Sequence, residues 1–253
     1  MERSERAALF FCAACADNGA MRLILFLCAL FTAGPALAVD RTFSVTSFSR
    51  VRVVGPVTVE IVTGGSPTAR AQGDRMGIDR LRIETSGDTL MIGIDRTNWV
   101  GDSPQVANAR AVVYVGAPRI AALSIIGAGD ISIDRVTGAS FNLIVTGAGR
   151  ARIDRLDVDQ LTVGINGVGS AKLAGKAKQA RIRSQGEGEI DATALAADDA
   201  DISLIGAGEI RLIANRSARN LLKGSGRIII AGNPACTGTS EGSGEVICGK
   251  ADR

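Results

Sequence analysis

The sequence predicts an all-β fold, a parallel β-helix (solenoid) with a β-rich N-terminal cap. Three observations lead to this prediction. The triplet Gly-x-Gly occurs seven times in the C-terminal half, with successive first glycines 18 to 20 residues apart. On both sides of the triplets, apolar residues alternate with polar ones, which is the pattern of half-buried strands. No segment has the periodicity that would predict a helix of any length.

The first 38 residues have the features of a secretory leader. Met21-Arg22 precedes the apolar run Leu23 to Ala33, and the small-x-small sequence Ala36-Leu37-Ala38 follows it. A transmembrane helix needs about 20 apolar residues, so this run is short for one. We expect a signal peptide that is cleaved between Ala38 and Val39, with an uncleaved anchor as the alternative. Translation starts at Met1 or, in the interpretation we favour, at Met21.

Residues 39–119 form the β-rich N-terminal part. Gly64-Gly65-Ser66-Pro67 and Ser86-Gly87-Asp88 are turn signals between its alternating segments. The segment from Thr97 to Asn108, which contains Trp99, is expected to be a surface excursion. The predicted strands are Thr42–Val45, Arg50–Val53, Val57–Ile61, Leu81–Ile83 and Leu90–Ile94.

Residues 120–249 form the repeats, which we expect to make seven rungs. The predicted unit is a strand, a Gly-x-Gly corner, a second strand and a polar return such as Asp134 to Gly138. One unit cannot bury its apolar face alone, whereas stacked units can, so Leu123, Leu143 and Val163 should stack in one inward column. Glycine suits the corners because it allows a positive φ and has no Cβ where turns approach closely. The corner glycines are Gly127, Gly129, Gly147, Gly149, Gly167, Gly169, Gly186, Gly188, Gly206, Gly208, Gly224, Gly226, Gly242 and Gly244.

The last unit carries two cysteines where earlier units carry core residues. Cys236 and Cys248 are the only cysteines after the leader, which contains the other three. In an exported protein two cysteines indicate one disulfide, which here would close the end of the solenoid. A metal pair or two free thiols are the alternatives, and the sequence offers no other soft ligands nearby.

Composition excludes several classes of site. The chain has no histidine, and therefore no Ser-His-Asp or Cys-His machinery. Its 29 basic and 26 acidic residues leave a net charge of +3, which is no footprint for nucleic acid. None of the triplets extends to the dinucleotide pattern Gly-x-Gly-x-x-Gly. The repeat is about twice as long as the calcium-binding nonapeptide. The residues after the triplets include both acidic and basic side chains, which indicates cross-rung ion pairs rather than a metal site.

Paired carboxylates leave an enzymatic alternative open. Asp134 and Asp154 are 20 residues apart, which places them on adjacent rungs, and each is followed by arginine. Such a pair could serve glycoside hydrolysis or lyase chemistry. Asp-Arg is also an ordinary turn sequence, and Trp99 and Tyr114 are too few aromatic residues for an extended sugar platform.

The mature chain resembles the GIN-domain family, which is described as an auto-transporter adhesin head domain. The resemblance implies an exported bacterial protein with a single-stranded right-handed β-helix, and it brings no catalytic motif and no cofactor. It covers Phe43 to about Gly249, and the segments that carry it are Phe48–Val53, Val57–Ile61, Asp88–Ile92 and Ile120–Ile133, followed by the Gly-x-Gly units.

The functional expectation is an exported, non-catalytic binding or scaffolding module of the periplasm or bacterial cell surface. Its partner would be a cell-surface glycan or an envelope protein, with no nucleic acid, metal or cofactor. A carbohydrate-acting β-helix enzyme (hydrolase or lyase) is one alternative. A self-associating structural protein is another, since uncovered rungs can stack end to end.

Overall fold

The computed structural model describes residues 39–94 and 111–249. The predicted leader with its cleavage site after Ala38, and the excursion predicted from Thr97 to Asn108, lie outside these residues. Nearly all the regular structure is β-strand, as the sequence predicts. The N-terminal part contains β1 (Val39–Phe43), β2 (Arg50–Val54), β3 (Thr58–Thr63), β4 (Thr68–Gly73), α2 (Arg75–Asp79), β5 (Leu81–Ser86), β6 (Thr89–Ile94) and β7 (Ala111–Ala117).

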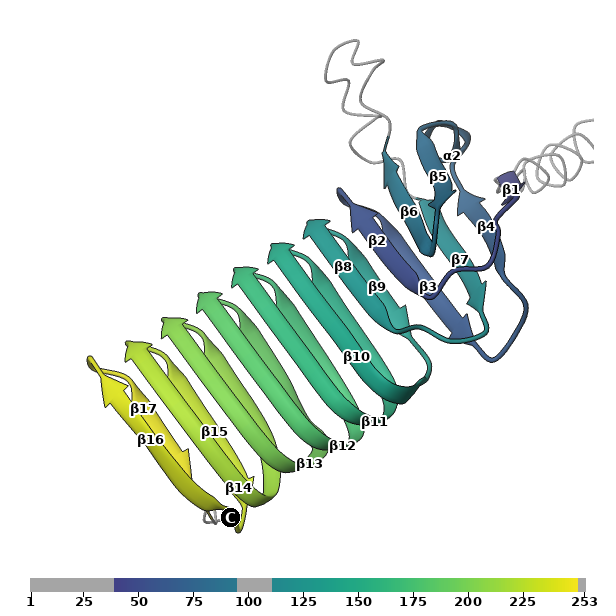
Figure 1. Cartoon of the computed structure of the whole chain (residues 1–253). Coiled ribbons are helices and arrows are strands. Elements are labelled where there is room, and N and C mark those ends of the chain that lie inside the picture. The colour runs from purple at the N-terminus through teal and green to yellow at the C-terminus, as the bar shows by residue number, and fades with distance from the viewer. Residues whose placement is uncertain (1–38, 95–110, 250–253) are drawn as a thin grey trace, which may run out of the picture. The chain divides into compact units, whose positions relative to one another are not determined.

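The repeats form a stack of parallel rungs (Figure 1). Leu123 pairs with Leu143, and Leu143 pairs with Val163, so the three residues stand in one column. All three are at most 1% exposed, which confirms the predicted inward column. The strands of the stack are β8 (Ala122–Gly127), β9 (Asp130–Ile133), β10 (Val136–Gly147), β11 (Arg150–Gly167), β12 (Ser170–Gly186), β13 (Glu189–Gly206), β14 (Glu209–Gly224), β15 (Arg227–Gly232), β16 (Ala235–Glu241) and β17 (Glu245–Cys248).

Each full rung contributes to three faces. Face A consists of β2, β6, β8, β16 and the residues of β10–β14 that lead to each first corner glycine. Face B consists of β3, β7, β9, β17, the residues of β11–β14 that directly follow each second corner glycine, and the start of β15. Face C is the segment that follows face B and precedes the face A residues of the next rung. It comprises residues 136–138 in the first full rung and 156–158 in the next. Two consecutive exposed residues, such as Asp154-Arg155 and Asp159-Gln160, interrupt the alternation where the chain turns from one face to the next.

Face C corrects the prediction of a polar return. Val136 begins β10 and pairs with Leu156, and both side chains are buried. The segment Asp134 to Gly138 is therefore not a loop along its whole length, because its last residues belong to a hydrogen-bonded strand. Its polar residues concealed this strand, since the third face contributes only one or two inward side chains per rung.

The corner glycines fulfil two different requirements. Gly147, a first glycine, has φ of +108°, in the region that L side chains rarely adopt. Gly169, a second glycine, lies so close to the rung before it that a Cβ there would stand 2.7 Å from the carbonyl oxygen of Gly149. The first glycine of the triplet therefore meets a conformational requirement as well as a steric one, whereas the second glycine meets the steric one.

The N-terminal part is continuous with the solenoid. β2 pairs in parallel with β8, and β3 pairs in parallel with β9, so these two strands form a further rung. Gly55 lies in the turn between them and packs against Gly127. The sequence Gly55-Pro56-Val57 lacks the second glycine, which is why a search for the triplet does not find this rung.

Further strands extend both faces beyond this rung. On face A, β6 pairs in parallel with β2 and antiparallel with β5. On face B, β7 pairs in parallel with β3 and antiparallel with β4, which pairs antiparallel with β1. β4 and β7 were not among the predicted strands. The prediction that the chain has no helix is also wrong, because α2 forms one helical turn. In this turn the Ile78 N–H donates to the Asp74 carbonyl, and the Ile78 side chain is buried. Five residues are too few to display a helical period in a sequence.

Candidate functional site

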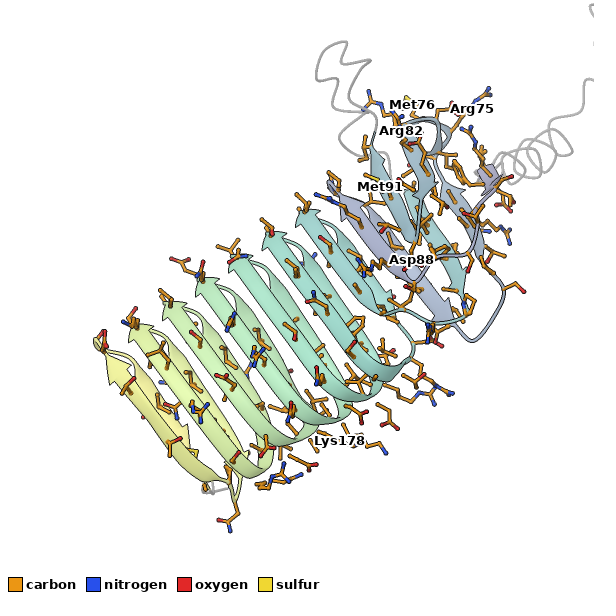
Figure 2. The ribbon with its side chains drawn as sticks, viewed as in Figure 1. Arg75, Met76, Arg82, Asp88, Met91 and Lys178 are labelled. Atoms are coloured by element: carbon orange, nitrogen blue, oxygen red, sulfur yellow. A yellow bond between two sulfur atoms is a disulfide. The ribbon has the colours of Figure 1, made fainter. Side chains whose placement is uncertain are left out.

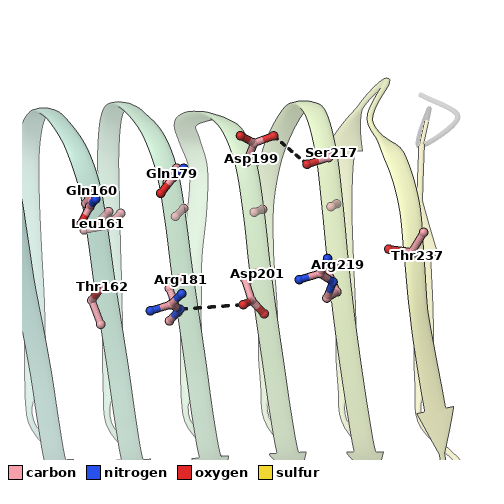
Figure 3. A pocket seen from close by; sticks show the side chains of 13 residues that line it. Gln160, Leu161, Thr162, Gln179, Arg181, Asp199, Asp201, Ser217, Arg219 and Thr237 are labelled. Carbon is pink, nitrogen blue, oxygen red and sulfur yellow. Dashed lines mark hydrogen bonds and ion pairs between the residues drawn. The ribbon is translucent and has the colours of Figure 1, made fainter.

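Face A carries a hollow of about 530 Å³ that spans consecutive rungs from β11 to β16 (Figure 3). We call this hollow the polar groove. Its lining residues are Gln160, Leu161, Thr162, Gln179, Ala180, Arg181, Asp199, Ala200, Asp201, Ser217, Ala218, Arg219 and Thr237.

The repeat itself positions these side chains. Residues seven and five positions before a first corner glycine point outward, and the residue between them points into the core. Parallel pairing stacks equivalent positions, so Gln160, Gln179 and Asp199 follow one another along one side of the groove. The other side is the ladder Thr162, Arg181, Asp201, Arg219 and Thr237.

The floor between the two ladders is made by small buried residues. Ala180, Ala200 and Ala218 are each at most 5% exposed and line the groove with little more than their backbone. In the earlier rungs the equivalent inward position holds Leu161 or Phe141. Polar side chains therefore supply nearly all the surface that a bound molecule could contact.

Asp199 is fixed by the neighbouring rung. Arg216 Nε donates to its Oδ1 at 2.9 Å, the Arg216 Nη2 also pairs with its Oδ2, and the Ser217 hydroxyl donates to Oδ1 at 2.6 Å. These hydrogen bonds, first from Arg216 and then from Ser217, lower the pKa of Asp199 from 3.8 to about 2. Asp199 is therefore a permanent carboxylate near neutral pH, and its charge is compensated by Arg216.

The second carboxylate of the groove is also engaged. Asp201 Oδ2 lies 3.8 Å from Arg181 Nε on the rung before it. Arg219, on the rung after Asp201, has no ion pair or hydrogen bond with any described residue. The amides of Gln160 and Gln179 likewise have no partner within the described part of the chain. The groove thus offers free amides at one end and a free guanidinium at the other.

Charge ladders outside the groove confirm the predicted cross-rung ion pairs. Arg150 Nε lies 3.4 Å from Asp130, and Arg227 Nε lies 3.2 Å from Glu245, both on face B. At the bend between faces C and A, Lys178 projects outward and its Nζ lies 2.7 Å from Asp159 (Figure 2). Exposed pairs of this kind contribute about 0–1 kcal/mol each, so they set the surface charge pattern more than the stability.

The two carboxylates considered for catalysis lie outside the groove. Asp134 Oδ1 accepts hydrogen bonds from the Thr63 backbone N–H at 2.9 Å and from the Thr63 hydroxyl at 3.1 Å. Asp154 pairs with Arg152 on its own strand at 2.7 Å. Asp134 therefore ties β3 to the first full rung, and Asp154 is part of a surface ion pair.

The C-terminal end of the stack differs from the other rungs. A disulfide joins Cys236 and Cys248, whose Cα atoms are 6.5 Å apart, as the sequence predicts. In β16 the inward positions after Cys236 hold the small residues Gly238 and Ser240, and Gly238 lies against the buried side chain of Asn220. In β17, Val246 packs against the core.

Within residues 39–94 and 111–249, no three His, Cys, Asp or Glu side chains gather in a way that could hold a metal ion. No helix in these ranges is long and apolar enough to cross a membrane.

The groove residues were not singled out from the sequence. Gln160, Arg181 and Asp201 are ordinary exposed residues when read singly, and no motif marks them. A signal nevertheless exists in the repeat register: the inward position changes from Phe141 and Leu161 to three consecutive alanines. Aligning the units by their corners and comparing this column would have located the floor.

The comparisons with known proteins agree with this architecture. A solved structure described as a "putative adhesin" from Bacteroides fragilis has a TM-score of 0.75 and 25% identity, and the match covers 84% of this chain and 97% of that one. A "putative lipid binding protein" from Parabacteroides distasonis has a TM-score of 0.65 at 20% identity, with 87% and 98% of the two chains covered. A "putative adhesin" from Parabacteroides merdae has a TM-score of 0.64 at 17% identity, with coverage of 84% and 96%. The last two matches, at lower identity, bear on the fold alone.

No curated protein sequence matches the chain significantly. The family model described as "Putative auto-transporter adhesin, head GIN domain" matches residues 47–234, which include the N-terminal rung and the whole polar groove except Thr237. This chain therefore belongs to the head GIN domain family.

Proposed function

We propose that this protein is an exported, non-catalytic binding module of the cell envelope, and that the polar groove binds an extended polar polymer, a cell-surface glycan. The observation that carries the proposal is the convergence of outward side chains from consecutive rungs on one hollow. Successive rungs are about 4.8 Å apart, so the groove offers hydrogen-bonding groups at a regular interval. A linear chain of sugar units has the repeating donors and acceptors that such a surface can bind.

The chemistry of the lining favours a glycan over an acyl chain. Gln160, Gln179, Thr162 and Thr237 provide amides and hydroxyls, which both donate and accept hydrogen bonds. The floor exposes almost no side-chain carbon, because its residues are buried. A lipid tail would find little apolar surface to cover here, although one structural neighbour is described as a lipid binding protein.

A rigid base supports this role. The ladder residues of β11 to β14 are each held between two rungs by backbone hydrogen bonds, and the core beneath contains fully buried Ile182 and Ile202. Binding to a preformed surface loses less conformational entropy than binding to a flexible loop. The descriptions of the family and of the Bacteroides fragilis neighbour as adhesins are consistent with recognition of this kind.

The electrostatics of the groove do not favour glycoside hydrolysis. A general acid in that reaction needs a raised pKa so that it is protonated near neutral pH. The pKa of Asp199 is instead lowered to about 2, and Asp201 is paired with Arg181. A module that binds without cleaving is therefore the better supported function.

Export to the periplasm or cell surface is part of the same proposal. The predicted leader with cleavage after Ala38 supports it, and so does the disulfide between Cys236 and Cys248, since disulfides persist in oxidising compartments.

The test uses the mature, oxidised protein on an array of neutral and acidic glycans, followed by titration of the best binder and a reducing-end assay for cleavage. The groove variant Gln160→Ala/Gln179→Ala should lose about thirtyfold in affinity, because two amide contacts at about 1 kcal/mol each are removed. The control is Gln185→Ala, an exposed amide on face A outside the groove. Absence of any glycan ligand, equal losses in both variants, or release of reducing ends would contradict the proposal. Capture of an envelope protein instead of a glycan would also contradict it.

A further inference from the structure

We infer that the glycan bound in the polar groove is acidic, and that Arg219 receives its carboxylate or sulfate group. The inference rests on the proposed function, since it names the class of glycan for the same groove. Of the charged side chains that line the groove, Asp199, Asp201 and Arg181 are paired within the protein, whereas Arg219 is not.

Both carboxylates of the groove are already compensated. Asp199 accepts hydrogen bonds from Arg216 and Ser217, and Asp201 lies within ion-pair distance of Arg181. The charge of each carboxylate is therefore balanced by an arginine of the protein itself.

Arg219 is the charged lining residue that no described side chain compensates. It is an exposed residue of β14, and its register partners on the neighbouring rungs are Asp201 and Thr237 (Figure 3). Asp201 lies between Arg181 and Arg219 in this ladder, and its ion pair is with Arg181. The ladder therefore has two guanidinium groups and one carboxylate. A guanidinium with five donors binds a carboxylate or sulfate in a bidentate manner, and charge-assisted bonds are about twice as strong as neutral ones.

The charged side chains in and around the groove also have a net positive charge. The bend beside the groove carries Asp159, Lys178, Asp198 and Arg216, and Arg183 lies two residues beyond Arg181. Together with the groove residues these make five basic and four acidic side chains, so the excess is one positive charge. The hydroxyl groups of Ser217 and Thr237 flank Arg219 along the groove. An acid group seated there would have one guanidinium and a nearby hydroxyl donor.

The free amides lie at the other end, at Gln160 and Gln179. They suit the neutral hydroxyls of the sugar chain rather than its charge. We therefore expect neutral hydroxyl groups of the ligand to contact β11 and β12, and an acid group of the ligand to contact β14.

The experiment compares three polymers: polygalacturonate, which carries carboxylates, dextran sulfate, which carries sulfates, and neutral dextran. Affinities are measured by isothermal titration for the mature protein, for Arg219→Gln and for Arg155→Gln. Arg155 is the matched control, because it is an exposed arginine at another bend with no partner among the described residues, and its loss changes the net charge equally. Thermal melts establish that both variants fold as the parent does.

We expect the parent to bind at least one of the two acidic polymers more tightly than neutral dextran. Arg219→Gln should weaken that binding about tenfold or more, whereas Arg155→Gln should change it less than threefold. The acidic polymer that shows this dependence identifies the group, carboxylate or sulfate. Equal losses for the two variants would overturn the inference, because they would indicate a general charge effect.

Failure of the inference and failure of the proposed function give different results. If the parent binds neutral dextran as well as the acidic polymers, and the Gln160→Ala/Gln179→Ala variant weakens all of them, the groove binds glycans but Arg219 does not select acidic ones. If no polymer binds to the parent and the glycan array is also negative, the glycan-binding function itself is wrong.

Discussion

A Cβ atom on Gly147 would stand 2.8 Å from the carbonyl oxygen of Gly127, one rung below. Gly147 also has φ of +108°. The same relationship recurs at the later first glycines, so the spacing of the rungs at this corner depends on the absence of side chains.

Gly147→Val should therefore destabilise the protein markedly. The substitution adds both a steric clash with Gly127 and a backbone strain of about 1–3 kcal/mol, so we expect a loss of more than about 2 kcal/mol in the free energy of unfolding. Gly164→Val is the matched control, because nothing lies within 4 Å of a Cβ there and its backbone is an ordinary strand. Urea unfolding measures both. Similar curves for the parent and Gly147→Val would contradict the assigned corner.

Ser184→Ala should stabilise the protein. Ser184 is 1% exposed, and its hydroxyl oxygen has no hydrogen-bond partner in the described structure. Removing an unsatisfied buried hydroxyl should raise the free energy of unfolding by about 1 kcal/mol. Ser203→Ala, one rung further and half-exposed, should leave stability within about 0.5 kcal/mol of the parent. A lower melting temperature for Ser184→Ala would show that the hydroxyl does find a partner.

The contribution of Asp199 to stability should depend on pH in the acid range. Its pKa is lowered from 3.8 to about 2 in the folded protein, so the unfolded chain binds the proton more readily. The stabilisation is therefore fully present above pH 3.8 and is lost as pH falls toward 2. Asp199→Asn should be less stable than the parent at pH 7, and the difference should disappear near pH 2. A difference that stays constant over this range, measured by urea unfolding, would refute the assignment.

Reduction of the disulfide should loosen the last rung. Closing a loop of this size contributes about 2–3 kcal/mol in the chain-entropy model, so dithiothreitol should lower the free energy of unfolding by about that amount. The double variant Cys236→Ser/Cys248→Ser should show the lower stability from the start and no response to the reductant. Hydrogen exchange should quicken in β16 and β17 first, because each pairs with one neighbour only among the described strands. A parent protein that is insensitive to reductant would argue against a structural bond.

The regular part of the fold could be predicted from sequence because its signal is repeated. Leu123, Leu143 and Val163 are unremarkable singly, but their constant distance from the next glycine defines a column that the structure confirms. The rung at Gly55 was not found, because Pro56 and Val57 replace the rest of the triplet and no neighbouring unit has the same length. Face C was predicted to be a polar return because polar residues predominate in it.

The groove could not be predicted in the same way. Its side chains meet only because separate rungs stack in register, and the pairing of Asp199 with Arg216 depends on a bend between two faces. Neither the bend nor the partner is encoded in a local pattern. The predicted alternatives for chemistry, Asp134 and Asp154, were chosen for their spacing, but the structure gives each of them a neighbouring partner instead of a ligand site.

Backbone NMR of the ¹⁵N-labelled mature protein shows directly whether the polar groove is the ligand-binding surface. On titration with the glycan that binds best, we predict chemical-shift changes concentrated in residues 160–162, 179–181, 199–201 and 217–219, with the signals of Arg150 and Arg227 on face B unchanged. Changes concentrated on face B, with the groove signals left in place, would show that the ligand binds elsewhere than in the groove.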